Sequence, residues 1–231
     1  MDPQKYYDEF SKNYDSPRDR GYHAYLDEEE FSCIKDLAKG DVLEVGCGTG
    51  LIMQKIKTAR SVTGIDISPG MLEHAKKRGL NVMLADATDL PFEDNSFDLI
   101  YSFKVLAHIP MIRKAISEMV RVTRPGGMIA AEFYNANSLR FLTKRLRAGM
   151  VADGVSERDV FIRFDTVDEF RGYFPPEMKV ARICSARHCL MSPVAMGLPM
   201  IGSMVKLAEK TMAKTPISVF GGFVTLVMQK S

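Results

Sequence analysis

The organisation of this chain can be worked out from one segment, Val42-Leu43-Glu44-Val45-Gly46-Cys47-Gly48-Thr49-Gly50. Its three apolar residues around one acid indicate the end of a buried, parallel β-strand. The three alternating glycines let the backbone turn sharply and approach a bound molecule closely. Residues 51–56 continue with apolar side chains at helical spacing. Strand, glycine turn and helix in this order place a ligand at the carboxyl end of a strand in an open α/β sheet.

The spacing of the glycines separates two classes of nucleotide-like ligand. A dinucleotide fingerprint requires glycines at positions 46, 48 and 51, and position 51 is Leu51. This disfavours an NAD-dependent oxidoreductase. Asp66 ends the next apolar run, residues 62–66, 20 positions after Gly46. A carboxylate there can accept hydrogen bonds from both hydroxyls of a ribose.

Four further strands follow at regular intervals, over residues 62–66, 81–87, 97–102 and, after a glycine turn, 124–130. The series resembles the class I S-adenosylmethionine (SAM)-dependent methyltransferases, especially the branch with the ubiquinone and menaquinone C-methyltransferases. The resemblance is strong over residues 40–135 and holds only in outline elsewhere. Each motif is weak by itself, and the five in order carry the resemblance.

The resemblance implies an α/β, Rossmann-like fold. It implies a seven-stranded, mostly parallel sheet of order 3-2-1-4-5-7-6 with strand 7 antiparallel, helices on both faces and a small helical lid. Residues 179–186 and 219–228 are the expected sixth and seventh strands, and Ser68 and Thr166 are predicted helix N-caps. We expect residues 1–231 to be one domain: lid and helices in 1–38, cofactor-binding core in 39–135, and an insertion with the last helices and strands in 136–231.

SAM is the cofactor that the resemblance implies. Asp66 would accept from the ribose, Asp86 from the adenine amino group, and the Ala87 amide would meet a ring nitrogen. Tyr14 matches a lid residue, or belongs to an arm docked on the core, and Met71 lies beside the cofactor or fills the core. The implied cofactor site consists of Tyr14, Glu44, Gly46, Cys47, Gly48, Asp66, Ile67, Met71, Asp86, Ala87 and Ser102.

His108 is the candidate catalytic residue, just beyond the fourth strand. In many small-molecule relatives a histidine at this place lies near the acceptor, and an imidazole can take a proton near neutral pH. The alternative is a capping or packing histidine. The chain lacks the Asn-Pro-Pro-Tyr and Pro-Cys motifs of relatives that methylate DNA adenine, protein glutamine or cytosine C5. Tyr101 and Ser102 stand where metal-dependent relatives carry acidic ligands, so we predict no metal.

Composition restricts the partners. A net charge of +2 over 231 residues gives no reason to expect nucleic acid. The polar N-terminal residues predict no leader, and no uncharged run is long enough to span a bilayer. The four cysteines lack zinc-ligand spacing, and we expect free thiols in a cytoplasmic protein; they are Cys33, Cys47, Cys184 and Cys189.

The acceptor is expected to be a small or hydrophobic molecule methylated at O or C. The basic helix expected over 139–147 presents a solvated face, or binds an anionic acceptor or a membrane surface. Residues 190–204 carry no charge and are rich in Met, so they roof an apolar acceptor pocket, join a homodimer or contact a membrane. Monomer and homodimer both stay open. A non-catalytic SAM-binding or scaffold protein is the alternative function.

Overall fold

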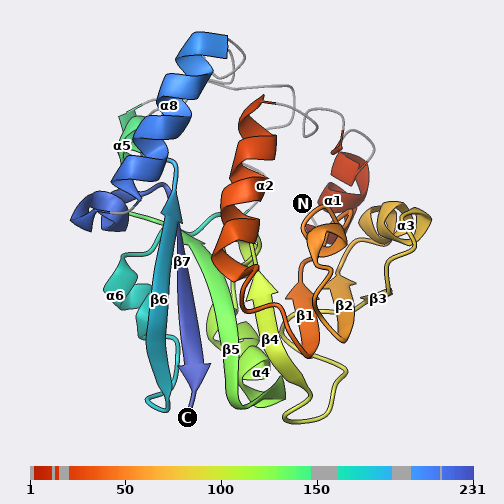
Figure 1. The fold of residues 1–231 in the computed structure, drawn as a ribbon. Coiled ribbons are helices and arrows are strands. Elements are labelled where there is room, and N and C mark those ends of the chain that lie inside the picture. Colours follow the sequence, from red (N-terminus) through yellow and green to blue (C-terminus); the bar gives the residue numbers. More distant parts are fainter. Residues whose placement is uncertain (1–2, 12–13, 16–20, 147–160, 189–198, 214) are drawn as a thin grey trace.

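The computed structural model describes residues 3–11, 14–15, 21–146, 161–188, 199–213 and 215–231. In this part of the chain seven strands form one sheet of order β3-β2-β1-β4-β5-β7-β6 (Figure 1). Strand β7 is antiparallel to both of its neighbours, and the other pairs are parallel. The predicted topology is therefore confirmed. The strands are β1 Asp41–Val45, β2 Ser61–Asp66, β3 Val82–Leu84, β4 Phe97–Ser102, β5 Thr123–Tyr134, β6 Met178–Ala186 and β7 Phe223–Lys230.

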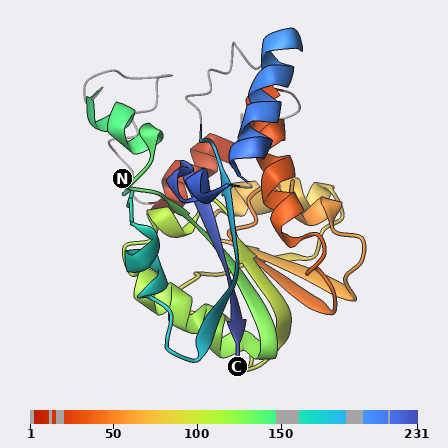
Figure 2. The ribbon, with the colours of Figure 1, turned by 60° about the vertical axis from the view of Figure 1, so that its left-hand side comes forward.

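Helices cover both faces of the sheet. Figure 2 shows α4 and α6 on one side and α2 on the other. In Figure 1, α1, α5 and α8 lie toward the end of the sheet to which β1 and β4 point. The helices are α1 Pro3–Ser11, α2 Gly21–Ile34, α3 Pro69–Lys77, α4 Ile112–Val122, α5 Leu139–Leu146, α6 Val167–Arg171 and α8 Pro199–Met212, with 3₁₀ turns η1 Met53–Lys55, η2 Leu106–His108 and η4 Pro216–Phe220.

The two faces of the sheet are packed by separate apolar clusters. Helix α4 has apolar residues at helical spacing, and this stripe is buried on one face: Ile112, Ala115, Ile116 and Met119. On the opposite face the end of α2 packs through Ile34 against β1, β4 and β5. Because helices cover both faces of the sheet, the sequences of the parallel strands are nearly continuous runs of apolar residues.

Several predicted boundaries were wrong. The helix expected over 51–56 is only the 3₁₀ turn η1, and the strand expected over 81–87 ends at Leu84. The last strand begins at Phe223 rather than 219, because η4 occupies the preceding residues. The predicted caps are correct: Ser68 accepts from the Met71 amide, and Thr166 forms a capping box with Glu169.

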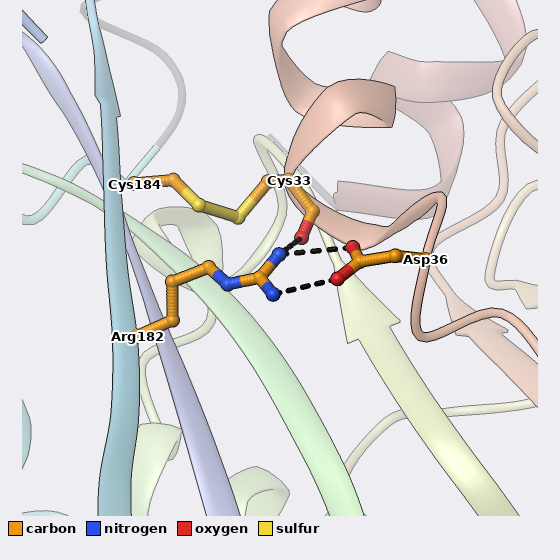
Figure 3. Close-up of a disulfide and its surroundings, with 4 residues drawn as sticks. All are labelled: Cys33, Asp36, Arg182 and Cys184. Atoms are coloured by element: carbon orange, nitrogen blue, oxygen red, sulfur yellow. Dashed lines mark hydrogen bonds and ion pairs between the residues drawn. A yellow bond between two sulfur atoms is a disulfide. The ribbon is translucent and has the colours of Figure 1, made fainter. Parts of the chain in front are cut away.

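Two of the cysteines predicted to be free form a disulfide, Cys33–Cys184, with 151 residues between them in sequence (Figure 3). The prediction is wrong for this pair, because spacing along the chain cannot show that the end of α2 packs beside β6. Arg182 on β6 lies next to it, donating to both carboxylate oxygens of Asp36 at 2.9 and 2.7 Å and to the Cys33 carbonyl. Cys47 is free and buried, and Cys189 lies outside the described residues.

The Met-rich segment is described only from residue 199 onward, in α8. Its side chains there are exposed: Met200 by 80% and Met204 by 69%. Both side chains thus lie at the surface of the described structure. Residues 190–198 lie outside the described part, and the roof over an acceptor pocket stays a prediction. Within the described ranges, no helix combines the length and apolar character needed to cross a bilayer.

Candidate cofactor and acceptor site

The three loop glycines all have positive φ, at +77°, +53° and +83° for Gly46, Gly48 and Gly50. A Cβ on Gly46 would lie 2.3 Å from the Val105 side chain, and one on Gly50 would lie 2.2 Å from that of Leu80. A Cβ on Gly48 would meet nothing nearer than the Tyr14 ring, at 4.0 Å. Gly46 and Gly50 are thus required by packing inside the protein, whereas Gly48 leaves space that a ligand can approach.

Asp66 holds the glycine loop from the end of β2. One carboxylate oxygen accepts from the Gly48 amide at 2.8 Å and the other from the Ser68 amide at 2.9 Å. Burial raises the pKa of Asp66, against the effect of these amide donors. The Ile67 amide is a third donor to this carboxylate, and a carboxylate has about four acceptor sites, so one is left for another donor. The carboxylate can therefore order the loop and still accept from a ligand hydroxyl.

The N-terminal helix lies across this end of the sheet. Asp8 accepts from the Ser68 hydroxyl at 2.5 Å and from the Gly70 amide at 3.0 Å, which fixes α1 against the start of α3. Tyr7 contacts the ring of His108 edge-on at 6.3 Å between centroids. Helix α1 thus spans from the Asp66 side to the His108 side of the site.

The segment after α1 is attached to the glycine loop. Asp15 accepts from the Thr49 hydroxyl at 2.7 Å and from Arg78 at 2.6 Å, and Arg78 also donates to the Thr49 carbonyl at 2.9 Å. Burial opposes ionisation of Asp15, but the hydrogen bonds from Arg78 and Thr49 outweigh it and lower its pKa. This attachment places Tyr14 over Gly48, where the sequence predicts a lid.

A pocket lies between Tyr14, the glycine loop and α2. It brings together four of the predicted residues with seven others: Tyr14, Asp27, Glu30, Glu44, Gly46, Cys47, Thr49, Leu51, Ile52, Phe103 and Lys104. The pocket does not include Gly48, Asp66, Ile67, Met71, Asp86, Ala87 or Ser102.

A buried charge cluster in the pocket was missed from the sequence. The Lys104 Nζ lies 2.9 Å from Asp27 and 2.7 Å from Glu30, both on α2. Lys104 has a positive φ of 60°, and its amide donates to buried Glu132 at 3.0 Å. Two features of the sequence could have indicated this cluster. Asp27 and Glu30 are three residues apart and share a helix face, and Lys104 follows the end of β4 by two positions.

Glu44 and Ser102 are engaged with neighbouring strands. The Tyr101 hydroxyl donates to Glu44 at 2.8 Å, and the Ser102 hydroxyl donates to the Val45 carbonyl at 2.8 Å. Burial raises the pKa of Glu44 to about 8, although the Tyr101 hydrogen bond acts in the opposite direction. Both side chains join β1 to β4, and their contact with a cofactor stays a prediction.

The remaining predicted residues surround the loop in different settings. Ile67 is 37% exposed, whereas Met71 is 3% exposed and packed in the interior. One carboxylate oxygen of Asp86 accepts from the Thr88 amide at 2.7 Å. Asp86 directly precedes the half-buried Ala87. Burial raises the pKa of the Cys47 thiol. The Cys47 thiol is consequently protonated at neutral pH.

His108 is half-buried in η2 and uses both ring nitrogens. Its Nδ1 lies 3.1 Å from the Phe161 carbonyl and its Nε2 3.2 Å from the Tyr134 hydroxyl. A carbonyl only accepts, so Nδ1 must carry the proton and a neutral Nε2 accepts from Tyr134. The unprotonated Nε2 of His108 therefore points at the hydroxyl of buried Tyr134.

Comparison with known proteins finds a family match in the core of the chain. Residues 43–131 match the family model described as a methyltransferase domain. An uncharacterised Methanocaldococcus jannaschii protein is 31% identical over 151 residues, 64% of this chain and 58% of that protein. The demethylmenaquinone methyltransferase of Renibacterium salmoninarum is 42% identical over 96 residues, 40% of each chain.

Solved structures share the fold of this chain. A SAM-dependent methyltransferase of Thermotoga maritima superposes with a TM-score of 0.67 at 20% identity, covering 99% of this chain and 97% of that one. The chain spans about half the length of the curated relatives it matches, 58%, 58% and 44% of the first three.

Proposed function

We propose that the chain transfers a methyl group from SAM to a small or hydrophobic acceptor, at oxygen or carbon. The observation that supports it best is the space over Gly48, next to the Asp66 carboxylate and under Tyr14. A glycine whose neighbours leave room for a Cβ, in a loop whose other glycines are required by packing, fits a site kept open for a ligand.

The groups around this space match the chemical parts of SAM, which supplies an electrophilic methyl group when bound. Asp66 accepts from ribose hydroxyls, and Asp86 from the adenine amino group. The pocket with Lys104, Asp27 and Glu30 offers both signs of charge to the zwitterionic amino-acid end. Tyr14 covers the loop and excludes water.

His108 serves the acceptor side of the proposed reaction. An oxygen or acidic carbon acceptor must lose a proton, and His108 Nε2 is the basic nitrogen at this place. Since Nε2 accepts from Tyr134 at 3.2 Å, the proton reaches it through the Tyr134 hydroxyl or after that hydroxyl turns away. Replacing His108 by Ala lowers turnover about 10²–10⁴-fold with nearly unchanged SAM affinity. Unchanged turnover would assign His108 to packing.

Acceptor identity, oligomeric state and compartment belong to this proposal as well. The cytoplasmic location stays a prediction, and the Cys33–Cys184 disulfide weighs against it, because cytosolic thiols are kept reduced. A non-catalytic SAM-binding protein is the alternative function. Extract molecules that gain about 14 Da with the protein and SAM identify an enzyme and its acceptor.

Calorimetry of cofactor binding tests the proposal directly. Wild-type protein should bind SAM or S-adenosylhomocysteine, and Asp66→Ala should weaken that binding by roughly 1.5–3 kcal/mol through loss of a charge-assisted hydrogen bond. Because Asp66 also accepts from Gly48 and Ser68, Asp66→Asn is the matched control that keeps an acceptor oxygen. Tighter binding of NAD than of SAM would refute the proposal.

A further inference from the structure

Arg140, on α5, is held in a cage of aromatic rings. Its guanidinium lies 4.4 Å from the ring centroid of Tyr134, 4.8 Å from that of Phe223 and 5.6 Å from that of Phe164. Its stem packs on Gly222, where a Cβ would lie 3.3 Å from the Arg140 Cβ and Cδ. The rings come from β5, β7 and the segment before α6, so three distant parts of the chain fix this cation.

The caged guanidinium is incompletely satisfied. Its Nη1 is buried and makes no hydrogen bond within the described part of the chain. A buried charged donor without an acceptor costs free energy, and native structures rarely keep one without a reason. The sequence alone left open a solvated face for the basic helix; Arg140 as a whole is half-buried, but this nitrogen does not reach solvent.

A second unsatisfied donor lies in the same apolar cluster. Tyr22 on α2 is 7% exposed, and its hydroxyl is buried without a hydrogen-bond partner among the described residues. The Arg187 guanidinium lies 5.2 Å from the Tyr22 ring and 5.7 Å from the Phe223 ring. Burial raises the pKa of Tyr22, while the nearby charges of Arg187 and Arg140 act against that rise. Both cations are therefore close enough to act on this phenol.

The cluster adjoins the proposed acceptor side. Tyr134, whose ring stacks with Arg140, is the residue whose hydroxyl meets His108 at 3.2 Å. Around it lie Tyr25, Phe223 and other apolar side chains of one buried cluster. The unsatisfied atoms, Arg140 Nη1 and the Tyr22 hydroxyl, can both donate. Such a place suits a ligand with an apolar body and an oxygen-rich, negatively charged end.

We propose that the acceptor is an apolar or aromatic carboxylic acid whose carboxylate accepts hydrogen bonds from Arg140 and Tyr22. This inference rests on the proposed methyl transfer and names the substrate class of that site. The carboxylate supplies the missing acceptor to both donors and neutralises a cation that the aromatic cage has removed from water. The acceptor's body then lies along Tyr134, toward His108.

Binding of matched acids and amides tests the inference. The probes are benzoate, 2-naphthoate and octanoate with their neutral amides, titrated by calorimetry with and without saturating S-adenosylhomocysteine. We expect at least one acid to bind 10-fold or more tightly than its amide. Arg140→Met keeps an apolar stem but no charge and should abolish the preference, and Tyr22→Phe should weaken the acid several-fold.

Arg113→Met is the matched control. Arg113 also stacks on a ring, that of Tyr173 at 4.8 Å, but its Nη1 donates to the Gly172 carbonyl. This variant should keep the acid preference. Equal binding of every acid and its amide to wild-type protein, or a preference that survives both Arg140→Met and Tyr22→Phe, overturns the inference. Failure to bind S-adenosylhomocysteine refutes the proposed function instead. The two outcomes can be told apart because the acids are also titrated in the absence of S-adenosylhomocysteine.

Discussion

The two halves of the sheet build their sites in different ways. On the β1–β3 side, the glycine loop, Asp66 and Ser68 lie within 23 positions, residues 46–68, and contact one another directly. On the β5–β7 side, Arg140, Tyr22 and Phe223 come from three distant segments. The proposed cofactor side is thus specified by local spacing, and the proposed acceptor side by tertiary packing.

The difference explains what kind of change each half tolerates. A site made from adjacent residues depends on backbone conformation, so its weak points are the glycines with positive φ. A site assembled from distant segments depends on whatever holds these segments together. Here that includes the antiparallel pairing of β7 with β5 and β6 and the disulfide between α2 and β6.

The largest expected effect is a pH dependence located at Glu44, in the cofactor half. Burial raises its pKa from 4.5 to about 8, so the folded state binds a proton that the unfolded state has lost. The contribution of protonated Glu44 to the free energy of unfolding is therefore complete below about pH 4.5 and is lost as the pH rises to about 8. The loss is on the order of 5 kcal/mol. Urea unfolding at pH 5 and pH 8 measures it.

Glu44→Gln should remove the Glu44 contribution to this slope, because an amide does not titrate. The matched variant in the other half is Glu132→Gln on β5, whose carboxyl also has a pKa raised by burial. If Glu44→Gln leaves the slope unchanged while Glu132→Gln removes it, the pH dependence belongs to the acceptor half and the assignment to Glu44 is wrong.

A pair of glycine variants separates packing from ligand binding within the loop. Gly46→Ala combines φ +77° with a contact of 2.3 Å to Val105 and should cost about 4 kcal/mol of stability. Gly48→Ala meets only Tyr14 at 4.0 Å, so it should cost about 1–2 kcal/mol, fold, and lose SAM binding. Thermal unfolding and calorimetry measure both; a Gly48→Ala protein with normal SAM affinity would contradict this division.

The same contrast decides what the sequence could predict. The sheet order was implied by the family resemblance, whereas the turn at the glycine loop and the caps Ser68 and Thr166 followed from residues close in sequence; all are confirmed. Strand ends were less predictable, since tertiary contacts rather than propensity decide where pairing stops. The Lys104 cluster and the aromatic cage of Arg140 were missed because their members meet only in the folded chain.

A change at the junction of the two halves sharpens the comparison, because the Cys33–Cys184 disulfide joins α2 to the β6 edge (Figure 3). Reduction, or Cys184→Ser, should lower the free energy of unfolding by about 3 kcal/mol, since the bond closes a long loop in the unfolded chain. Denaturant unfolding with and without dithiothreitol measures this. Helix α2 carries Asp27, Glu30 and Tyr22, so loosening its end should also weaken SAM and carboxylate binding together.

Arg182→Met is the control for that prediction. Arg182 lies beside the disulfide and forms a non-covalent ion pair with Asp36. The pair is partly exposed, at 40% and 53% of the two side chains, so its loss should cost less than 1 kcal/mol. If Arg182→Met destabilises as much as Cys184→Ser, the ion pair rather than the disulfide holds α2 to β6. If reduction lowers stability but leaves both affinities unchanged, the two halves are stabilised together yet bind their ligands independently.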